Sequence, residues 1–194
     1  MNLLEKRILE DGVVLPGNVL KVDSFLNHQI DPLFFMEIGK EFAKRFEDRD
    51  IDKILTLEVS GIAIAFALGL VMEKPVIFAK KTQSKTLGDN VYSTSVYSYT
   101  KDRTYEVKVS KSLLEEDDAV LIIDDFLANG KALEGLIDIC NQAKASVEGI
   151  GILIEKGFQG GGKTLRKKGY EIESLAIIKS LENGNVEFDK VRDF

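Results

Sequence analysis

The chain of 194 residues has little of the chemistry that builds disulfides or zinc sites. It contains one cysteine, Cys140, and one histidine. A single cysteine excludes an internal disulfide, which fits a reducing cytoplasm. One cysteine and one histidine are also too few ligands for a Cys/His zinc site. Apolar runs approaching the roughly 20 residues of a membrane span are also missing. Residues 1–10 alternate charged with apolar side chains, unlike a signal peptide, so we expect a cytoplasmic protein.

The chain also has no excess of positive charge. Lysine and arginine total 26 against 32 acidic residues, which gives a net charge of −6. This balance argues against nucleic-acid binding, which needs a basic face. A phosphate ligand would have to be held by local cations or backbone N–H groups, because the field of the whole protein repels it. The remaining composition, 44% hydrophobic and 30% charged, is typical of one globular domain over 1–194.

Strand and helix patterns alternate through the middle of the chain. We expect strands at 53–58, 75–80, 119–124, 149–155 and 170–181. Asp31-Pro32 predicts a helix start, and an apolar stripe at helical spacing follows it. Nearly all-apolar residues predict a buried helix at 62–72, and a further helix is expected at 131–143, with Cys140 on its core face. This order predicts an α/β fold with a central parallel sheet flanked by helices.

The ends of the chain depart from this alternation. We expect a core at about 31–156 and a small hood formed by about 1–30 and 157–194. An Asn-Gly turn at 182–185 predicts a hairpin within the hood. Residues 82–110 are polar and rich in tyrosine, and they predict a hairpin with little contact to the core.

Charged residues follow four of the expected strands. Ligands of an open parallel sheet bind at the carboxyl ends of its strands, so these residues predict a site. They are Glu58, the pair Lys80-Lys81, the pair Asp124-Asp125, and the pair Glu155-Lys156. Each group alone can occur for other reasons, since acid pairs, for example, are also found as magnesium ligands or at solvated strand ends.

The residues after the acid pair indicate which kind of ligand this site could bind. The stretch A-V-L-I-I-D-D-F-L-A-N-G-K-A, residues 119–132, runs from a buried strand through two acids into a small-residue turn before a helix. Backbone N–H groups of such a turn, with the helix N-terminus, can hold a phosphate. The two acids would repel that phosphate, so vicinal ribose hydroxyls are the better partners for Asp124 and Asp125.

This stretch closely resembles the motif that binds phosphoribosyl pyrophosphate (PRPP) in type I phosphoribosyltransferases. Asn129 stands where most members carry threonine, a mild departure. Further segments, at 21–33, 58–63, 95–101, 121–130 and 151–159, resemble the bacterial members of that family that use xanthine. The resemblance covers essentially the whole chain. It implies the type I phosphoribosyltransferase fold, purine salvage, and transfer of the phosphoribosyl group of PRPP to xanthine with release of pyrophosphate.

The resemblance also implies a role for each matching residue. The 5-phosphate would be bound by Ala128, Asn129, Gly130, Lys131 and Ala132. Asp124 and Asp125 would hold the ribose, with Lys81 on the pyrophosphate. The loop around the pyrophosphate would be Glu58, Val59, Ser60 and Gly61, and xanthine would be bound by Leu20, Asn27 and Lys156. Mg²⁺ would arrive with PRPP rather than on protein ligands, the hairpin would close over the reacting centre, and the enzyme would be a homodimer.

Three other interpretations remain open at this point. A PRPP-sensing regulator of the same fold would need a DNA-binding module, and the expected helix at 2–11 is too short for one. An enzyme for guanine, hypoxanthine or adenine would share the common motif, so only 20–28 and 155–158 bear on the base. A flavodoxin-like receiver with Mg²⁺ on its acid pair leaves residues 58–61 unexplained.

Overall fold

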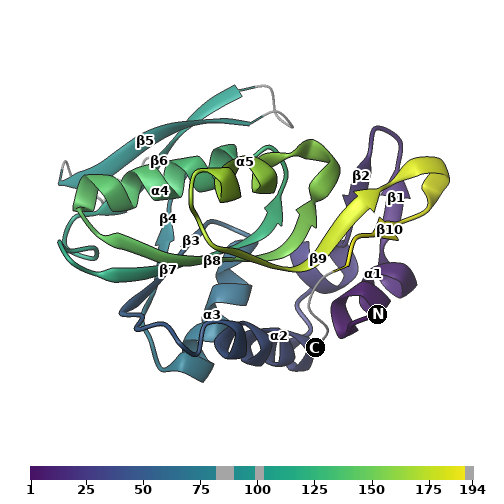
Figure 1. Ribbon diagram of the computed structural model, residues 1–194, viewed down its shortest axis with the longest axis horizontal. Helices are drawn as coiled ribbons and strands as arrows, with labels where there is room; N and C mark the ends of the chain where they lie inside the picture. The colour runs from purple at the N-terminus through teal and green to yellow at the C-terminus, as the bar shows by residue number, and fades with distance from the viewer. Residues whose placement is uncertain (82–89, 99–102, 191–194) are drawn as a thin grey trace.

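A sheet of six strands forms the centre of the molecule. The computed structural model describes residues 1–81, 90–98 and 103–190. The strand order is β10-β9-β8-β7-β3-β4, and every neighbouring pair is parallel except β10 with β9 (Figure 1). The strands are β3 Lys53–Leu57, β4 Val76–Ala79, β7 Ala119–Leu127, β8 Ser146–Lys156, β9 Ile172–Ser180 and β10 Glu187–Phe188. The predicted α/β fold with a mostly parallel sheet is confirmed.

Helices cover both faces of the sheet. On one face lie α2 (Pro32–Arg45) and α3 (Gly61–Met72), and on the other lies α4 (Lys131–Ala143), as Figure 1 shows. Side chains along β7 alternate between the two layers, as a strand's period of two requires. Leu121 and Ile123 pack with α2 and α3, while Val120 and Ile122 pack with α4. Two hydrophobic cores therefore hold β7 from both sides.

Helix α2 begins where the sequence predicts. The Asp31 side chain accepts a hydrogen bond from Phe34 N at 3.2 Å, and Pro32 occupies the first turn. The predicted apolar stripe is fully buried, and it consists of Phe35, Ile38, Phe42 and Phe46. Helix α3 differs from expectation, because it exposes Phe66 and Leu70 instead of being buried all round.

The hairpin of β5 (Val91–Ser98) and β6 (Arg103–Ser110) packs more firmly than predicted. Val96, Val107 and Val109 are buried in the core around α4. The Gln142 side chain of α4 also donates to the Ser93 carbonyl at 2.9 Å. The expectation of little core contact is wrong, because alternate positions of both strands carry valines toward α4. The expected closing segments at 82–89 and 99–102 lie outside the described residues.

The ends of the chain gather on one flank of the sheet (Figure 1). The elements there are α1 Leu3–Asp11, the hairpin of β1 Val13–Leu15 with β2 Val19–Lys21, the π-helical turn η1 Asp23–Asn27, and the 3₁₀ turns η2 Gly157–Gln159 and η3 Glu182–Gly184. The short helix α5 (Gly161–Lys167) connects β8 to β9. Because β9 pairs parallel with β8, the central sheet extends into residues that we expected to belong to the hood. Within the described residues, no helix has the length and apolarity to cross a membrane.

Candidate active site

The carboxyl ends of neighbouring strands meet at one edge of the sheet. Strands β3 and β4 pair in register to their last residues, Leu57 with Ala79, so Glu58 and Lys80 leave the sheet side by side. The acid pair differs from expectation, because β7 continues through it to Leu127 and still pairs with β8 there. On its other side β7 pairs with β3 only up to Ile122. The acids therefore face the opening left where β3 turns away.

Asp124 is a buried carboxylate, only 5% exposed. The strand carries this residue past the end of its pairing with β3 and into the interior, instead of leaving it at a solvent-facing strand end. Its Oδ1 accepts a hydrogen bond from Asp125 N at 3.0 Å, and Asp125 Oδ1 accepts from Phe126 N at 2.9 Å. Asp125 itself is half-buried. Each side chain is thus fixed against the backbone that follows it.

Burial controls the ionisation of this pair. Desolvation raises the pKa of Asp124 well above its ordinary value, and the neighbouring charge of Asp125 raises it further. Desolvation also raises the pKa of Asp125. The positive charge of Lys81 acts in the opposite sense on the pKa of both carboxyls. Lys81 is therefore the cation that favours the charged form of the pair.

The loop after β3 is tied to this lysine. The Glu58 carboxylate accepts a hydrogen bond from the backbone N–H of Lys81, and Glu58 N donates to Ala79 O at 3.1 Å. The peptide between Glu58 and Val59 is cis. Val59 points outward and is 74% exposed, while Ser60 precedes α3 without capping it. The Glu58 carboxylate is thus bonded to the backbone N–H of Lys81. The other residues of the loop, 59–61, remain available to a ligand.

The predicted phosphate turn lies between β7 and α4. Gly130 adopts φ 86°, a left-handed conformation that favours glycine, and it starts α4. The Asn129 side chain accepts a hydrogen bond from Lys131 N at 3.1 Å, so it shapes the turn from within. The Lys131 ammonium lies 2.8 Å from Glu134, whose pKa is lowered by hydrogen bonds from Lys131 and Lys168.

The three residues matched to the base lie on separate elements, with Lys156 at the end of β8, Asn27 at the end of η1 and Leu20 on β2. Lys156 Nζ donates to Asn18 O at 3.1 Å and lies 5.8 Å from the centre of the Phe126 ring. Burial lowers the pKa of Lys156. Asn27, the last residue of η1, is exposed. Leu20 is only 6% exposed, packs in the core and pairs with Val14 of β1.

Two side chains near the acids were not singled out from the sequence. Tyr105 of β6 lies with its ring 5.4 Å from Lys81 Nζ. Burial and, to a lesser degree, the charge of Asp124 raise the pKa of Tyr105. Its alternation with Val107 and Val109 could have placed it on the inner face of the hairpin. Thr56 of β3 is fully buried, and no sequence pattern marked it.

Cys140 takes no part in this site. It is fully buried in the core around α4, and burial raises the pKa of its thiol to about 12. A thiol that holds its proton so strongly is not a nucleophile at neutral pH. The prediction of a core residue is confirmed.

Comparison with known proteins identifies the family. A model of the phosphoribosyl transferase domain matches residues 26–189. The xanthine phosphoribosyltransferase of Finegoldia magna is 65% identical over 97% of this chain and 100% of its own length. The xanthine phosphoribosyltransferase of Oceanobacillus iheyensis is 57% identical over 97% of both chains.

Solved structures show the same fold. The adenine phosphoribosyltransferase of Rhodothermus marinus superposes with a TM-score of 0.72 at 21% identity, over 90% of this chain and 98% of that chain. The adenine phosphoribosyltransferase of Thermoanaerobacter pseudethanolicus gives a TM-score of 0.67 at 26% identity, over 76% and 81% of the two chains. By its sequence and by its fold, this chain belongs to the phosphoribosyl transferase family.

Proposed function

We propose that this chain is a purine salvage enzyme that transfers the 5-phosphoribosyl group of PRPP to xanthine. The products are xanthosine 5′-monophosphate and pyrophosphate. The observation that carries this proposal is the 65% identity, over almost the whole chain, to a protein named xanthine phosphoribosyltransferase. The relatives' names favour xanthine over guanine or hypoxanthine as the base, and the acid pair beside a phosphate turn suits PRPP.

The acid pair would bind the ribose. Carboxylates accept hydrogen bonds from two neighbouring hydroxyls, and Asp124 and Asp125 present oxygens side by side at the edge of β7. As pyrophosphate leaves C1, the ribose develops positive charge. Two carboxylates held by their own backbone, in a site from which water is partly excluded, stabilise that charge without reorganising.

The two phosphate-bearing ends of PRPP would occupy opposite sides of the acids. Backbone N–H groups of 128–132 and the start of α4 suit the 5-phosphate. Lys81 and the loop 58–61 suit the pyrophosphate, since Lys81 adds a cation and the Glu58 charge already has a backbone donor. Lys81 and the loop 58–61 would position the leaving pyrophosphate and stabilise its charge.

Magnesium would accompany the pyrophosphate. Within the described residues, no group of three acidic, histidine or cysteine side chains could hold a metal ion. At phosphate sites Mg²⁺ commonly keeps most of its ligands from the phosphates and water, so PRPP itself would supply most of its ligands here. Bound in this way, Mg²⁺ would neutralise charge on the leaving group.

Lys156 and Asn27 would recognise the purine by hydrogen bonds. The 6-oxo group of xanthine needs a donor, and the Lys156 ammonium can supply a charge-assisted one. The 2-oxo group needs a second donor, which the Asn27 amide can supply. Guanine carries an amine at that position and would leave buried polar groups unpaired. An amide can turn its oxygen to that amine instead, so guanine should be a poor substrate rather than an inert one.

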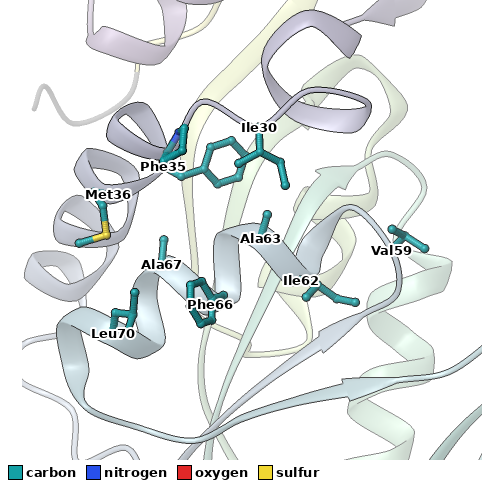
Figure 2. Close-up of a pocket in the computed structure, with 10 residues that line it drawn as sticks. Ile30, Phe35, Met36, Val59, Ile62, Ala63, Phe66, Ala67 and Leu70 are labelled. Carbon is teal, nitrogen blue, oxygen red and sulfur yellow. The ribbon is translucent and has the colours of Figure 1, made fainter.

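We further propose a cytoplasmic homodimer that forms through the faces of α2 and α3. An apolar pocket of about 550 Å³ lies between these helices, and Figure 2 shows the side chains that line it. Phe66 and Leu70 of α3 are 60% and 55% exposed, and Val59 of the candidate pyrophosphate loop lies at the end of the same surface. A second copy on this surface would bury these side chains and would reach the edge of the active site.

The substrate proposal is tested by measuring pyrophosphate release from PRPP and Mg²⁺ with each purine base in turn. We expect fast release with xanthine, slow release with guanine, and none with adenine, because Lys156 faces position 6 as a donor. Release that is fastest with guanine or hypoxanthine would overturn the assignment to xanthine. No release with any base would overturn the proposed activity.

Asn27→Asp should change the choice of base. A carboxylate repels the 2-oxo group of xanthine and accepts from the 2-amino group of guanine, so preference should shift toward guanine by about 1–3 kcal/mol. The measurement is the ratio of kcat/KM for the two bases. Asn141→Asp makes the same charge change on an exposed position of α4 and should leave the ratio unaltered. An unchanged ratio in Asn27→Asp would show that Asn27 does not read position 2.

Asp124→Asn should slow turnover and stabilise the fold. Loss of a charged hydrogen-bonding group should reduce turnover by roughly tenfold to over a hundredfold. Because burial raises the pKa of Asp124, its ionisation destabilises the folded state at pH 7. That destabilisation is present above the folded-state pKa and disappears as pH falls below the unfolded value. The melting temperature of Asp124→Asn should therefore exceed wild type at pH 7, with a smaller difference in acid.

The same measurements on Asp138→Asn, an exposed position of α4, should match wild type in both turnover and melting temperature. Wild-type turnover in Asp124→Asn would contradict the ribose assignment. A lower melting temperature at pH 7 would contradict the assignment of Asp124 as a destabilising buried charge.

Phe66→Glu should separate the dimer. Light scattering should give wild type twice the mass of one chain, and a charge at the centre of the apolar surface should reduce it to one. Leu113→Glu makes the same change at a side chain that is 51% exposed after β6, and this variant should remain dimeric. A monomeric wild type, or a Phe66→Glu variant that stays dimeric, would contradict the proposed surface.

A further inference from the structure

Thr56 carries a buried hydroxyl that lacks a partner among the described residues. The residue lies on β3 and is fully buried, and within the part of the chain that the structure describes its Oγ1 makes no hydrogen bond. Buried polar groups are normally satisfied, because an unpaired one loses its hydration and gains nothing in return. Valine has nearly the same shape and would fill the position without this penalty. An unpaired hydroxyl at this position is therefore unexpected, and it suggests that the hydroxyl forms a hydrogen bond in another state of the molecule.

The hydroxyl lies beside the acid pair. An ideal Cβ on Gly61 would lie 2.2 Å from Thr56 Oγ1 and 3.1 Å from Asp124 Oδ1. Both oxygens thus approach the same side of the Gly61 backbone, at the start of α3. A side chain at position 61 would collide with the hydroxyl, which is held on a rigid β-branched residue. Glycine is needed here for space, because it leaves room for the two oxygens.

Asp124 has the capacity to accept this hydroxyl. A carboxylate offers about four acceptor positions, and the backbone N–H of Asp125 occupies one on Oδ1. Burial excludes water from the carboxylate, so a donor from the protein is worth more here than at the surface. Because both oxygens lie within 3.1 Å of the same point beside Gly61, a rotation of the Asp124 side chain on binding the ribose hydroxyls would bring a carboxylate oxygen toward the hydroxyl.

We propose that Thr56 is a positioning residue for Asp124, whose hydroxyl donates a hydrogen bond to the carboxylate when the phosphoribosyl group is bound. This inference rests on the proposed function, since it needs Asp124 to hold the ribose. The bond fixes the carboxylate against the ribose and favours its charged form as positive charge develops at C1. The hydroxyl is unsatisfied in the free enzyme and satisfied once the phosphoribosyl group is bound, and the fixed carboxylate acts most strongly as positive charge develops at C1, so part of the contribution appears in the transition state.

Thr56→Val tests the proposal by removing the oxygen and keeping the shape. Turnover should fall by roughly tenfold. The KM for xanthine should stay near the wild-type value, because Thr56 is not matched to the base. The melting temperature of the free enzyme should be equal to wild type or higher, since an unpaired buried hydroxyl is removed. Thr56→Ser keeps the oxygen and should recover most of the turnover, which a purely structural role does not predict.

A second pair keeps the test decisive if Thr56→Val folds poorly. Thr56→Ser and Thr56→Ala remove the same methyl group and differ by one oxygen, so the serine variant should be faster by a similar factor. Thr164→Val makes the valine exchange at an exposed threonine of α5 and should keep wild-type turnover.

Equal turnover in the two members of either pair, wild type with Thr56→Val or serine with alanine, would overturn the inference while leaving the proposed function intact. If wild type releases no pyrophosphate with any base, the proposed function fails first and this inference falls with it.

Discussion

Strand β7 carries a carboxylate into the interior of the protein, and the neighbouring elements are arranged around that charge. The strand pairs with β8 beyond the point at which its pairing with β3 stops, so Asp124 is buried at an opening in the sheet. Lys81 supplies a nearby cation, and Glu58 holds the backbone of Lys81. Gly61 begins α3 without a side chain and keeps the same opening free. A buried charge costs stability unless partners compensate it, so a carboxylate kept here beside the proposed phosphate turn favours a role in ligand binding.

A second network joins the proposed phosphate turn to the end of β8, where the base is proposed to bind. Arg166 of α5 forms two hydrogen bonds to Glu155 at 2.9 and 2.8 Å, and Ser174 donates to the same carboxylate at 2.5 Å. Glu155 directly precedes Lys156, while Gly161, at the other end of α5, donates to the Ala128 carbonyl at 3.1 Å. Helix α5 therefore holds both the end of β8 and the turn before α4, which is the proposed phosphate site. Its short length suits this role, because each of its ends contacts a different part of the site.

Much of the fold could be predicted because its patterns are local. The Asp31 cap, the apolar stripe of α2 and the Asn-Gly turn before β10 each depend on residues a few positions apart. The errors share a different cause. The true length of β7, the packing of the hairpin on α4 and the place of β9 in the sheet all depend on distant partners. Polarity made 82–110 read as a loose segment, while valines at alternate positions anchor its described strands.

The sequence by itself determined the chemistry of the protein: two acids after a buried strand, a glycine turn before a helix, and a resemblance that covers the chain. These features are short-range, since neighbouring residues define a turn, a cap or a motif. Only the tertiary structure decided that Asp124 is buried, that Thr56 and Gly61 meet beside it, and that α3 presents Phe66 outward. Burial and contact depend on which elements pack against one another. Residues as far apart along the chain as Glu58 and Lys156 come to the candidate site because parallel strands bring their carboxyl ends to one edge.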